Sequence, residues 1–277
     1  MIKQFKNNSY IKADKIEIGK DFQIGKNVQI DVRGMFKIGD YSRFGDDVRI
    51  NAQQVLIGNH FFHYEPGLNI GGGGSHSLEA ELVVGDRCVF HNNKINLARP
   101  VIMGDDVGLS PDVDIITHGF WNSILEGYPC EYGKVVINNG VIIGQRSFIL
   151  MNTSIAENVV VGANSTVKGF LDKDKSIYAG NPAKFIREIE EPSLEEKKKI
   201  FINIIKDFNE KFIEMGYQFL PNISVDYPKI IILDFIINVE TKEYEGIEDE
   251  ITDNFRDHLR RYGIRIYTER PFGNLTV

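Results

Sequence analysis

The sequence predicts a mainly β protein, in which a triangular solenoid of short parallel strands is followed by a small α+β domain. An aliphatic residue recurs every six positions over much of the first two thirds of the chain. The repeat stops near Glu190-Glu191-Pro192, and beyond it two amphipathic helical patterns flank a strand-like run. We therefore expect one domain over residues 1–188 and a second, of unknown role, over residues 189–277.

The six-residue period is clearest between Ile137 and Val167. Its aliphatic positions are Ile137, Ile143, Ile149, Ile155, Val161 and Val167. Helices repeat every 3.6 residues and strands every 2, whereas a short strand followed by a tight corner can repeat every six. Three such sides close a coil of roughly 18 residues, and coils stack at about 4.8 Å. The pattern predicts a left-handed parallel β-helix, and its regularity disfavours the alternative, an irregular β-sandwich.

Two stretches interrupt the period. The spacing from Ile115 to Ile137 is not a multiple of six, so a loop is expected to leave the coil around residues 118–134. Residues 60–82 are also aperiodic and contain four consecutive glycines at 71–74. These glycines are not a phosphate-binding loop, because no Lys-Ser/Thr pair follows them. Loops that leave a rigid scaffold frequently carry function.

The second domain begins with a helix signal. Ser193 and Glu196 have the spacing of a capping box, and the following apolar stripe ends at Gly216. A strand is expected over residues 230–239, then a helix with its apolar face at 251, 255 and 259, and a last strand over 264–268. Such stripes usually pack into a core, so this domain reveals no function by its sequence.

Charge and composition exclude several classes of protein. With 32 Lys and Arg against 39 Asp and Glu, the net charge is −7, which disfavours nucleic-acid binding because that rests on clustered basic residues. The two cysteines, Cys88 and Cys130, are too few for a disulfide scaffold or a thiolate metal cluster. The first residues lack a signal-peptide core, and no run approaches the ~18 apolar residues of a membrane span. We expect a cytoplasmic protein.

Residues 84–188 resemble the hexapeptide-repeat acetyltransferases, in particular the maltose, galactoside and related sugar acyltransferases. The resemblance is carried by the hexads from 144 to 168 and by the segment 179–187, which reads Ala-Gly-Asn-Pro-Ala-Lys-Phe-Ile-Arg. It implies transfer of an acetyl or other short acyl group from acyl-CoA to a hydroxyl or amino group of a sugar, either nucleotide-linked or a glycan precursor. It also implies a homotrimer whose donor and acceptor meet between subunits, and no metal.

The resemblance further implies roles for individual residues. His118, which precedes the loop, would be the general base, and an imidazole suits this role because its pKa lies near neutral pH. Asn92 would contact the acceptor or the developing oxyanion, with Asn93 and His91 as alternatives for that place. Coenzyme A would be bound by Gln145, Ala163, Lys168, Lys184 and Arg187. On the loop, Trp121 and Tyr128 could close over the acceptor or only fix the loop.

Two other functions are open. A metalloenzyme like the γ-class carbonic anhydrases shares this fold but needs three convergent histidines. The positions five residues from His118 are Ser123 and Val113, and the pair His60 and His63 lies in an aperiodic stretch. A non-catalytic scaffold is the other alternative, and it would leave His118 without a role.

Overall fold

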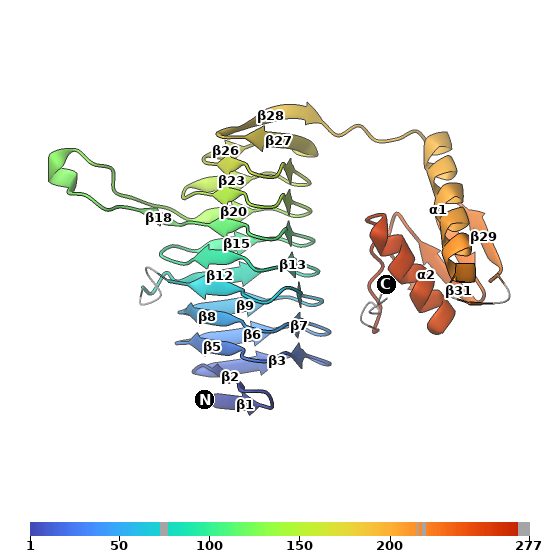
Figure 1. Cartoon of the computed structure of the whole chain (residues 1–277), viewed down its shortest axis with the longest axis horizontal. Coiled ribbons are helices and arrows are strands. Elements are labelled where there is room, and N and C mark those ends of the chain that lie inside the picture. Colours follow the sequence, from blue (N-terminus) through green and yellow to red (C-terminus); the bar gives the residue numbers. More distant parts are fainter. Residues whose placement is uncertain (73–76, 215, 218–219, 271–277) are drawn as a thin grey trace. The chain divides into compact units, whose positions relative to one another are not determined.

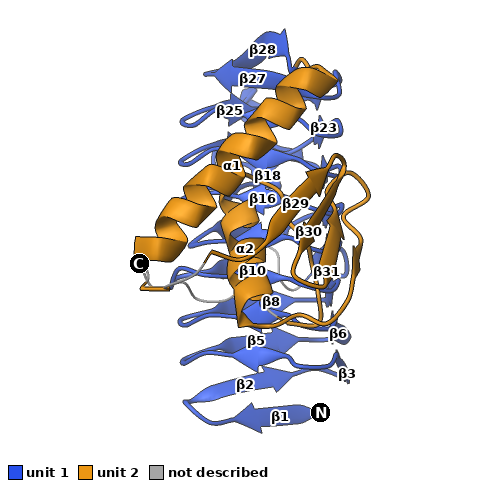
Figure 2. Ribbon diagram, turned by 90° about the vertical axis from the view of Figure 1, so that its right-hand side faces the viewer, with its two compact units in different colours: residues 1–189 blue, residues 190–277 orange. Residues whose placement is uncertain are grey.

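The chain folds into two compact units, residues 1–189 and residues 190–277, which Figure 2 colours separately. The computed structural model describes residues 1–72, 77–214, 216–217 and 220–270. The division falls one residue after the boundary expected from the sequence. Part of the four-glycine segment lies outside the described residues.

The first unit is a left-handed β-helix, as the hexads predict, in which the chain passes through three sheets, A, B and C, in turn (Figure 1). Sheet A contains β1 (Ile2–Phe5), β2 (Ser9–Lys12), β5 (Gln29–Val32), β8 (Arg49–Ala52), β11 (Asn69–Gly71), β14 (Lys94–Asn96), β17 (Asp114–Ile115), β22 (Phe148–Ile149) and β25 (Thr166–Val167). Sheet B contains β3 (Lys15–Ile18), β6 (Met35–Ile38), β9 (Gln54–Ile57), β12 (Glu81–Val84), β15 (Val101–Met103), β20 (Val135–Ile137), β23 (Thr153–Ile155) and β26 (Phe170–Leu171). Sheet C contains β4 (Gln23–Ile24), β7 (Arg43–Phe44), β10 (Phe62–His63), β13 (Val89–Phe90), β16 (Gly108–Leu109), β21 (Ile142–Ile143), β24 (Val160–Val161), β27 (Ser176–Gly180) and β28 (Ala183–Glu188). Pairing within these sheets is parallel except at the two ends, where β1–β2 and β27–β28 are antiparallel.

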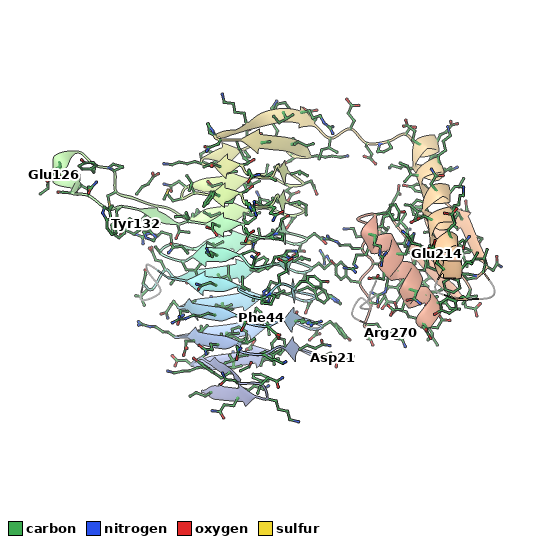
Figure 3. All side chains as sticks on the ribbon, in the orientation of Figure 1. Asp21, Phe44, Glu126, Tyr132, Glu214 and Arg270 are labelled. Atoms are coloured by element: carbon green, nitrogen blue, oxygen red, sulfur yellow. The ribbon has the colours of Figure 1, made fainter. Side chains whose placement is uncertain are left out.

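The repeated aliphatic residues fill the interior of the coil. All six hexad positions between Ile137 and Val167 are at most 1% exposed. In the earlier coils, aromatic rings take this place, with Phe61 5.3 Å from Phe44 and 5.0 Å from Phe90 between ring centroids; Figure 3 labels Phe44. Each coil is therefore held to the next by backbone hydrogen bonds and by a continuous apolar column.

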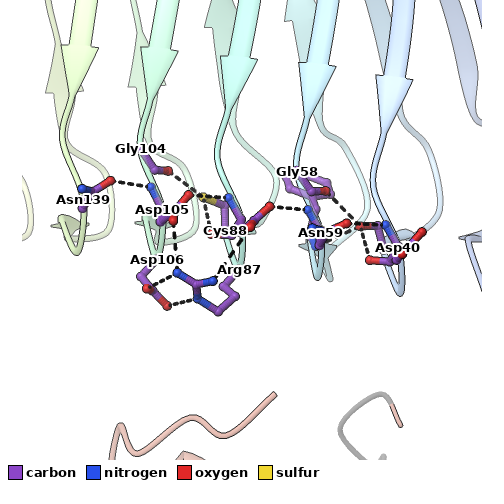
Figure 4. Close-up of polar contacts among 12 residues, drawn as sticks. Asp40, Gly58, Asn59, Arg87, Cys88, Gly104, Asp105, Asp106 and Asn139 are labelled. Atoms are coloured by element: carbon purple, nitrogen blue, oxygen red, sulfur yellow. Dashed lines mark hydrogen bonds and ion pairs between the residues drawn. The ribbon is translucent and has the colours of Figure 1, made fainter. Parts of the chain in front are cut away.

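A ladder of Asp and Asn side chains joins the coils along the corner between sheets B and C (Figure 4). The backbone N–H of Asn59 donates to Asp86 at 2.7 Å, that of Asp86 to Asp105 at 2.8 Å, and that of Asp105 to Asn139 at 2.8 Å. The Arg87 guanidinium bonds the carboxylates of Asp105 and Asp106 on the next coil. These side chains satisfy corner N–H groups that the parallel sheets leave unpaired.

The second unit packs two helices on a four-stranded antiparallel sheet. Its elements are α1 (Leu194–Glu214), β29 (Ile223–Asp226), β30 (Lys229–Ile232), β31 (Phe235–Asn238), β32 (Tyr244–Glu245) and α2 (Glu250–Arg261). The capping box at the start of α1 forms, because Ser193 N–H donates to the Glu196 carboxylate and Glu196 N–H to Ser193 Oγ. No helix in the described part of the chain is long and apolar enough to cross a bilayer.

Two expectations for the second unit were wrong. Residues 230–239 form a hairpin rather than one strand, because Leu233 turns the chain with a φ of 54°. Residues 264–268 are not a strand. The carbonyl of Ile266 instead accepts from the buried guanidinium of Arg256, which also pairs with Glu248 and Asp253. A side chain thus holds a segment that a sheet was expected to hold.

Two leucines four residues apart test the packing of the coil. Leu82 is fully buried and Leu78 is 79% exposed. We expect Leu82→Ala to lower the free energy of unfolding by about 2–5 kcal/mol, because it leaves a cavity in a closed interior. Leu78→Ala should change it by no more than about 0.5 kcal/mol. Denaturant unfolding of both variants measures the difference, and equal losses would contradict this packing.

Candidate active site

His118 lies at the corner between sheets A and B, where the long loop leaves the coil. It begins the short strand β18 (His118–Gly119), which pairs with β19 (Glu131–Tyr132). The loop runs outward to a 3-10 turn, η1 (Ile124–Glu126), before it returns; Figure 3 labels Tyr132 near its base and Glu126 near its tip. The interruption predicted from the broken period is therefore a hairpin that begins at the histidine.

Asn96 fixes the orientation and the tautomer of His118. The Asn96 side-chain oxygen lies 2.8 Å from His118 Nδ1, and it also accepts from Thr117 Oγ1 at 2.7 Å and from the backbone N–H of Ala98 at 3.2 Å. Because a backbone N–H can only donate, this Asn96 atom is the amide oxygen and His118 Nδ1 must carry the proton. The lone pair of Nε2 is thus left available as a base.

Aromatic rings pack around the His118 ring. Phe120 and Tyr132 lie 5.3 and 5.9 Å from it between centroids, and the Arg99 guanidinium lies 4.7 Å from the centroid of Tyr132. Next to this cluster is a hollow of about 420 Å³ under the loop. It is lined by Gly119, Phe120, Trp121, Asn122, Tyr128, Pro129, Glu131, Met151 and Lys168. Trp121 and Tyr128 therefore both face a space large enough for a sugar ring.

Lys168, expected near coenzyme A, lies at the same sheet A–B corner as His118. Its ammonium group pairs with Glu131 at 2.6 Å, and Asn152 donates to the same carboxylate at 2.9 Å. The Lys168 ammonium, followed by Asn152, lowers the pKa of Glu131. In this arrangement Lys168 holds the base of the loop to the coil.

The other residues expected to bind coenzyme A lie at a different corner, between sheets C and A. Gln145 follows β21 and Ala163 follows β24; these strands are in register, and Gln145 C=O accepts from Asn164 N–H at 2.9 Å. Lys184 pairs with Ala179, one residue before this corner, whereas Arg187 lies farther along β28, opposite Ile177. Both cations are exposed.

Neighbouring coils approach each other closely at two glycines beside Gln145 and Ala163. A Cβ at Gly144 would lie 2.5 Å from Ala163 N, and one at Gly162 would lie 2.8 Å from Ala179 Cβ. The sequence must therefore keep both positions free of side chains. Residues 144–145 and 162–163 thus form a partly exposed strip that runs from one coil to the next.

Asn92 also lies at the sheet C–A corner and does not contact His118 of its own chain. It exchanges hydrogen bonds with Asp112 on the next coil, at 2.7 and 2.9 Å. Of its neighbours, Asn93 is fully buried and bonds Ser110 C=O, while His91 is partly exposed. Within one chain, sheet A lies between Asn92 and His118, and the side chain that meets His118 is Asn96. Asn96 was not singled out from the sequence.

Metal-dependent chemistry, the first alternative, has less support in the coil. The described residues contain no group of three or more His, Cys, Asp or Glu side chains arranged to hold a metal ion. Burial lowers the pKa of His63 to about 4, and its Nδ1 accepts from Gly45 N–H. The three convergent histidines of a γ-class metalloenzyme are not found in the described ranges.

Two curated acetyltransferases match part of the chain. It is 45% identical over 56 residues to a probable macrolide acetyltransferase of Lysinibacillus sphaericus, a match that covers 20% of this chain and 31% of the relative. It is 41% identical over 58 residues to a putative lipopolysaccharide biosynthesis O-acetyl transferase, WbbJ, of Escherichia coli (strain K12), covering 21% and 29%. The chain thus spans less than a third of the length of either relative. No family model matches it. The relatives confirm the resemblance to hexapeptide-repeat acetyltransferases.

Solved structures with the same kind of coil are also similar. One is a point mutant of AntD, an N-acyltransferase from Bacillus cereus, in complex with dTDP and coenzyme A (23% identity, 67% of this chain and 93% of that chain, TM-score 0.40). Another is the polysialic acid O-acetyltransferase OatWY (16% identity, 66% and 95%, TM-score 0.42). A third is a galactoside acetyltransferase in complex with coenzyme A (23% identity, 50% and 65%, TM-score 0.38).

The two cysteines provide a test of the coil and the loop. Burial raises the pKa of the Cys88 thiol to about 12, whereas Cys130 is exposed on the loop. Because the thiolate is the reactive form, we expect iodoacetamide at pH 8 to modify Cys130 and leave Cys88 intact. Peptide mass spectrometry reads both sites, and full denaturation should expose both. Equal modification of the two cysteines in the folded protein would contradict the buried position of Cys88.

Proposed function

We propose that this protein transfers an acetyl or other short acyl group from acyl-CoA to a sugar, with His118 as the general base. The observation that carries the proposal is the hydrogen bond from His118 Nδ1 to Asn96, which leaves the Nε2 lone pair free in the neutral imidazole. The two residues that follow His118, Gly119 and Phe120, line the hollow under the loop. An imidazole held in one tautomer next to a space for a ligand is typical of proton transfer. The similarity to two acetyltransferases supports the acyl donor.

The reaction needs one proton to be moved twice. The acceptor hydroxyl gives its proton to His118 Nε2 while its oxygen forms a bond to the thioester carbonyl carbon. The C–S bond then breaks, and the coenzyme A sulfur leaves and takes the proton from His118. The products are the acylated sugar and free coenzyme A thiol. Throughout, Asn96 holds Nδ1–H and stabilises the imidazolium that forms in between.

The active site is proposed to lie between subunits. His118 is at the sheet A–B corner, while Gln145, Ala163 and Asn92 are at the sheet C–A corner. Within one chain, the width of sheet A therefore separates the proposed base from the strip of residues 144–145 and 162–163, which we call the donor strip. A head-to-tail contact between these two corners of neighbouring chains would join them, and such contacts close into rings. The resemblance favours a ring of three. Asn92 of one subunit would then face His118 of the next.

Acyl-CoA is proposed to extend along the strip beside Gly144 and Gly162. Gln145 and Ala163 border this strip, and Lys184 and Arg187 offer exposed positive charge near its end for the phosphate groups. Lys168, in its ion pair with Glu131, is better suited to hold the loop than to bind a phosphate of the same subunit.

Replacement of His118 and Asn96 tests the base. On a hydroxyl acceptor, we expect His118→Ala to lower kcat/KM by about 10²- to 10⁴-fold. Asn96→Ala should lower it by about 10- to 100-fold, the range seen when the partner that orients a metal-bound histidine is lost. Free thiol release from acetyl-CoA across a panel of sugars and nucleotide sugars measures both. Full activity of His118→Ala on a hydroxyl acceptor would exclude this base.

Asn96→Asp separates positioning from mere stability. A carboxylate at this place still accepts from Nδ1–H, and its negative charge raises the pKa of the imidazole. The activity of this variant should recover relative to Asn96→Ala, and the acidic limb of its pH–rate profile should move to higher pH. A variant that only damaged the fold would lose activity with an unchanged profile.

A mixture of two inactive variants tests whether subunits share the site. Ala163→Trp should fill the donor strip and abolish the thermal stabilisation that acetyl-CoA gives, whereas Glu157→Trp, at the sheet B–C corner, should not. When His118→Ala and Ala163→Trp chains are co-expressed, some interfaces pair an intact His118 with an intact strip. Activity should therefore return, and a failure to recover any activity in verified mixed oligomers would place the whole site in one chain.

A further inference from the structure

The donor strip at the sheet C–A corner ends against three side chains of the earlier coils. Equivalent corner positions of successive coils stack in columns. One column, read toward the N-terminus, contains Gly144, Ser110, His91 and Tyr64, and the column beside it contains Gln145, Pro111, Asn92 and Glu65. The donor strip thus ends at the rings of His91 and Tyr64. Glu65 lies beside Asn92 in the adjacent column. A group that follows Asn92 along this corner meets these three side chains next.

The rings of Tyr64 and His91 form a partly exposed aromatic surface. Their centroids are 6.0 Å apart, and the ring of Phe62 lies at the same distance from that of Tyr64. Tyr64 is 42% exposed, so part of its side chain is accessible to a ligand. Burial lowers the pKa of His91, with a smaller opposing effect of Glu65.

The carboxylate of Glu65 lacks a strong partner among the described residues. Its Oε1 lies 3.7 Å from His91 Nδ1, beyond hydrogen-bond distance, and that nitrogen has no hydrogen-bond partner in the described structure. Half of the Glu65 side chain is exposed. Asp46 and Asp47 lie at the same corner on the preceding coil, and Arg43 is on β7 of that coil.

We propose that Tyr64, Glu65 and His91 bind the acceptor, and that they select a sugar with a protonated amino group next to the hydroxyl that is acylated. This inference rests on the proposed function. A carboxylate beside an aromatic face attracts a cation by charge and through the ring quadrupole. The ammonium group would donate to Glu65 and lie over Tyr64. This position would direct a neighbouring hydroxyl toward Asn92 and toward the general base, His118, of the next subunit.

Isothermal titration of the full chain, saturated with coenzyme A at pH 6.5, tests the proposal. The probes are methyl glucosaminide, which carries an ammonium group, and methyl glucoside, which does not. We expect the first to bind about 10- to 100-fold more tightly, the effect of one hydrogen bond to a charged group. Glu65→Gln should remove this preference. Asp47→Asn, which removes a carboxylate from the same corner, should keep it.

Three results would overturn the inference: equal affinity for the two probes, no binding of methyl glucosaminide, or a preference that survives Glu65→Gln. Failure of the proposed function gives a different result, since the protein would then neither bind coenzyme A nor release thiol from acetyl-CoA with any acceptor. Tyr64→Ala adds a second readout. It should weaken binding of both probes, because both lose a ring face, whereas Tyr64→Phe should retain it.

Discussion

The stacking of one coil on the next is the constraint on which the first unit depends. Parallel strands of two to five residues are too short to be stable alone, so they are held by the strands of neighbouring coils and by inward aliphatic residues. Corners then have to turn the chain sharply, and Asn and Asp residues such as Asn27, Asp47, Asn158 and Asn164 do so with φ near 55°. The ladder of Figure 4 satisfies N–H groups at one corner. The aliphatic repeat, the Asn and Asp corners and the ladder therefore act together to hold each coil on the next.

Stacking also determines where function can lie. A residue at a corner lies directly over its equivalents in the neighbouring coils, so a column of chosen side chains can be assembled from residues about 18 to 35 positions apart. An insertion is tolerated at a corner because it leaves the strands in register, and the loop after His118 is such an insertion. The proposed base, the loop and the proposed donor strip therefore all lie at corners of a rigid frame.

The sequence predicts the coil well because its signal repeats. The loop was predicted because the period breaks there, and His118 was singled out because the resemblance to the acetyltransferases implies a histidine before that loop. Asn96 was missed because its contact with His118 comes from the register of β14 and β17, which no local pattern contains. In the second unit, the aliphatic run 230–239 carries no sign of the turn at Leu233. Nothing near 264–268 indicates that Arg256, buried on α2, donates to the carbonyl of Ile266. Long-range side-chain contacts are what the sequence does not display.

The two halves of the proposed site support each other chemically. A neutral amine is a good nucleophile and needs little help, whereas a hydroxyl needs its proton removed as it attacks. The fixed tautomer of His118 is thus of most use to a hydroxyl acceptor. A subsite that holds a neighbouring amino group in its protonated form at Glu65 would remove the lone pair of that amine and prevent its acylation. The acidic subsite on one subunit and the base on the next would then select the same atom, the hydroxyl oxygen.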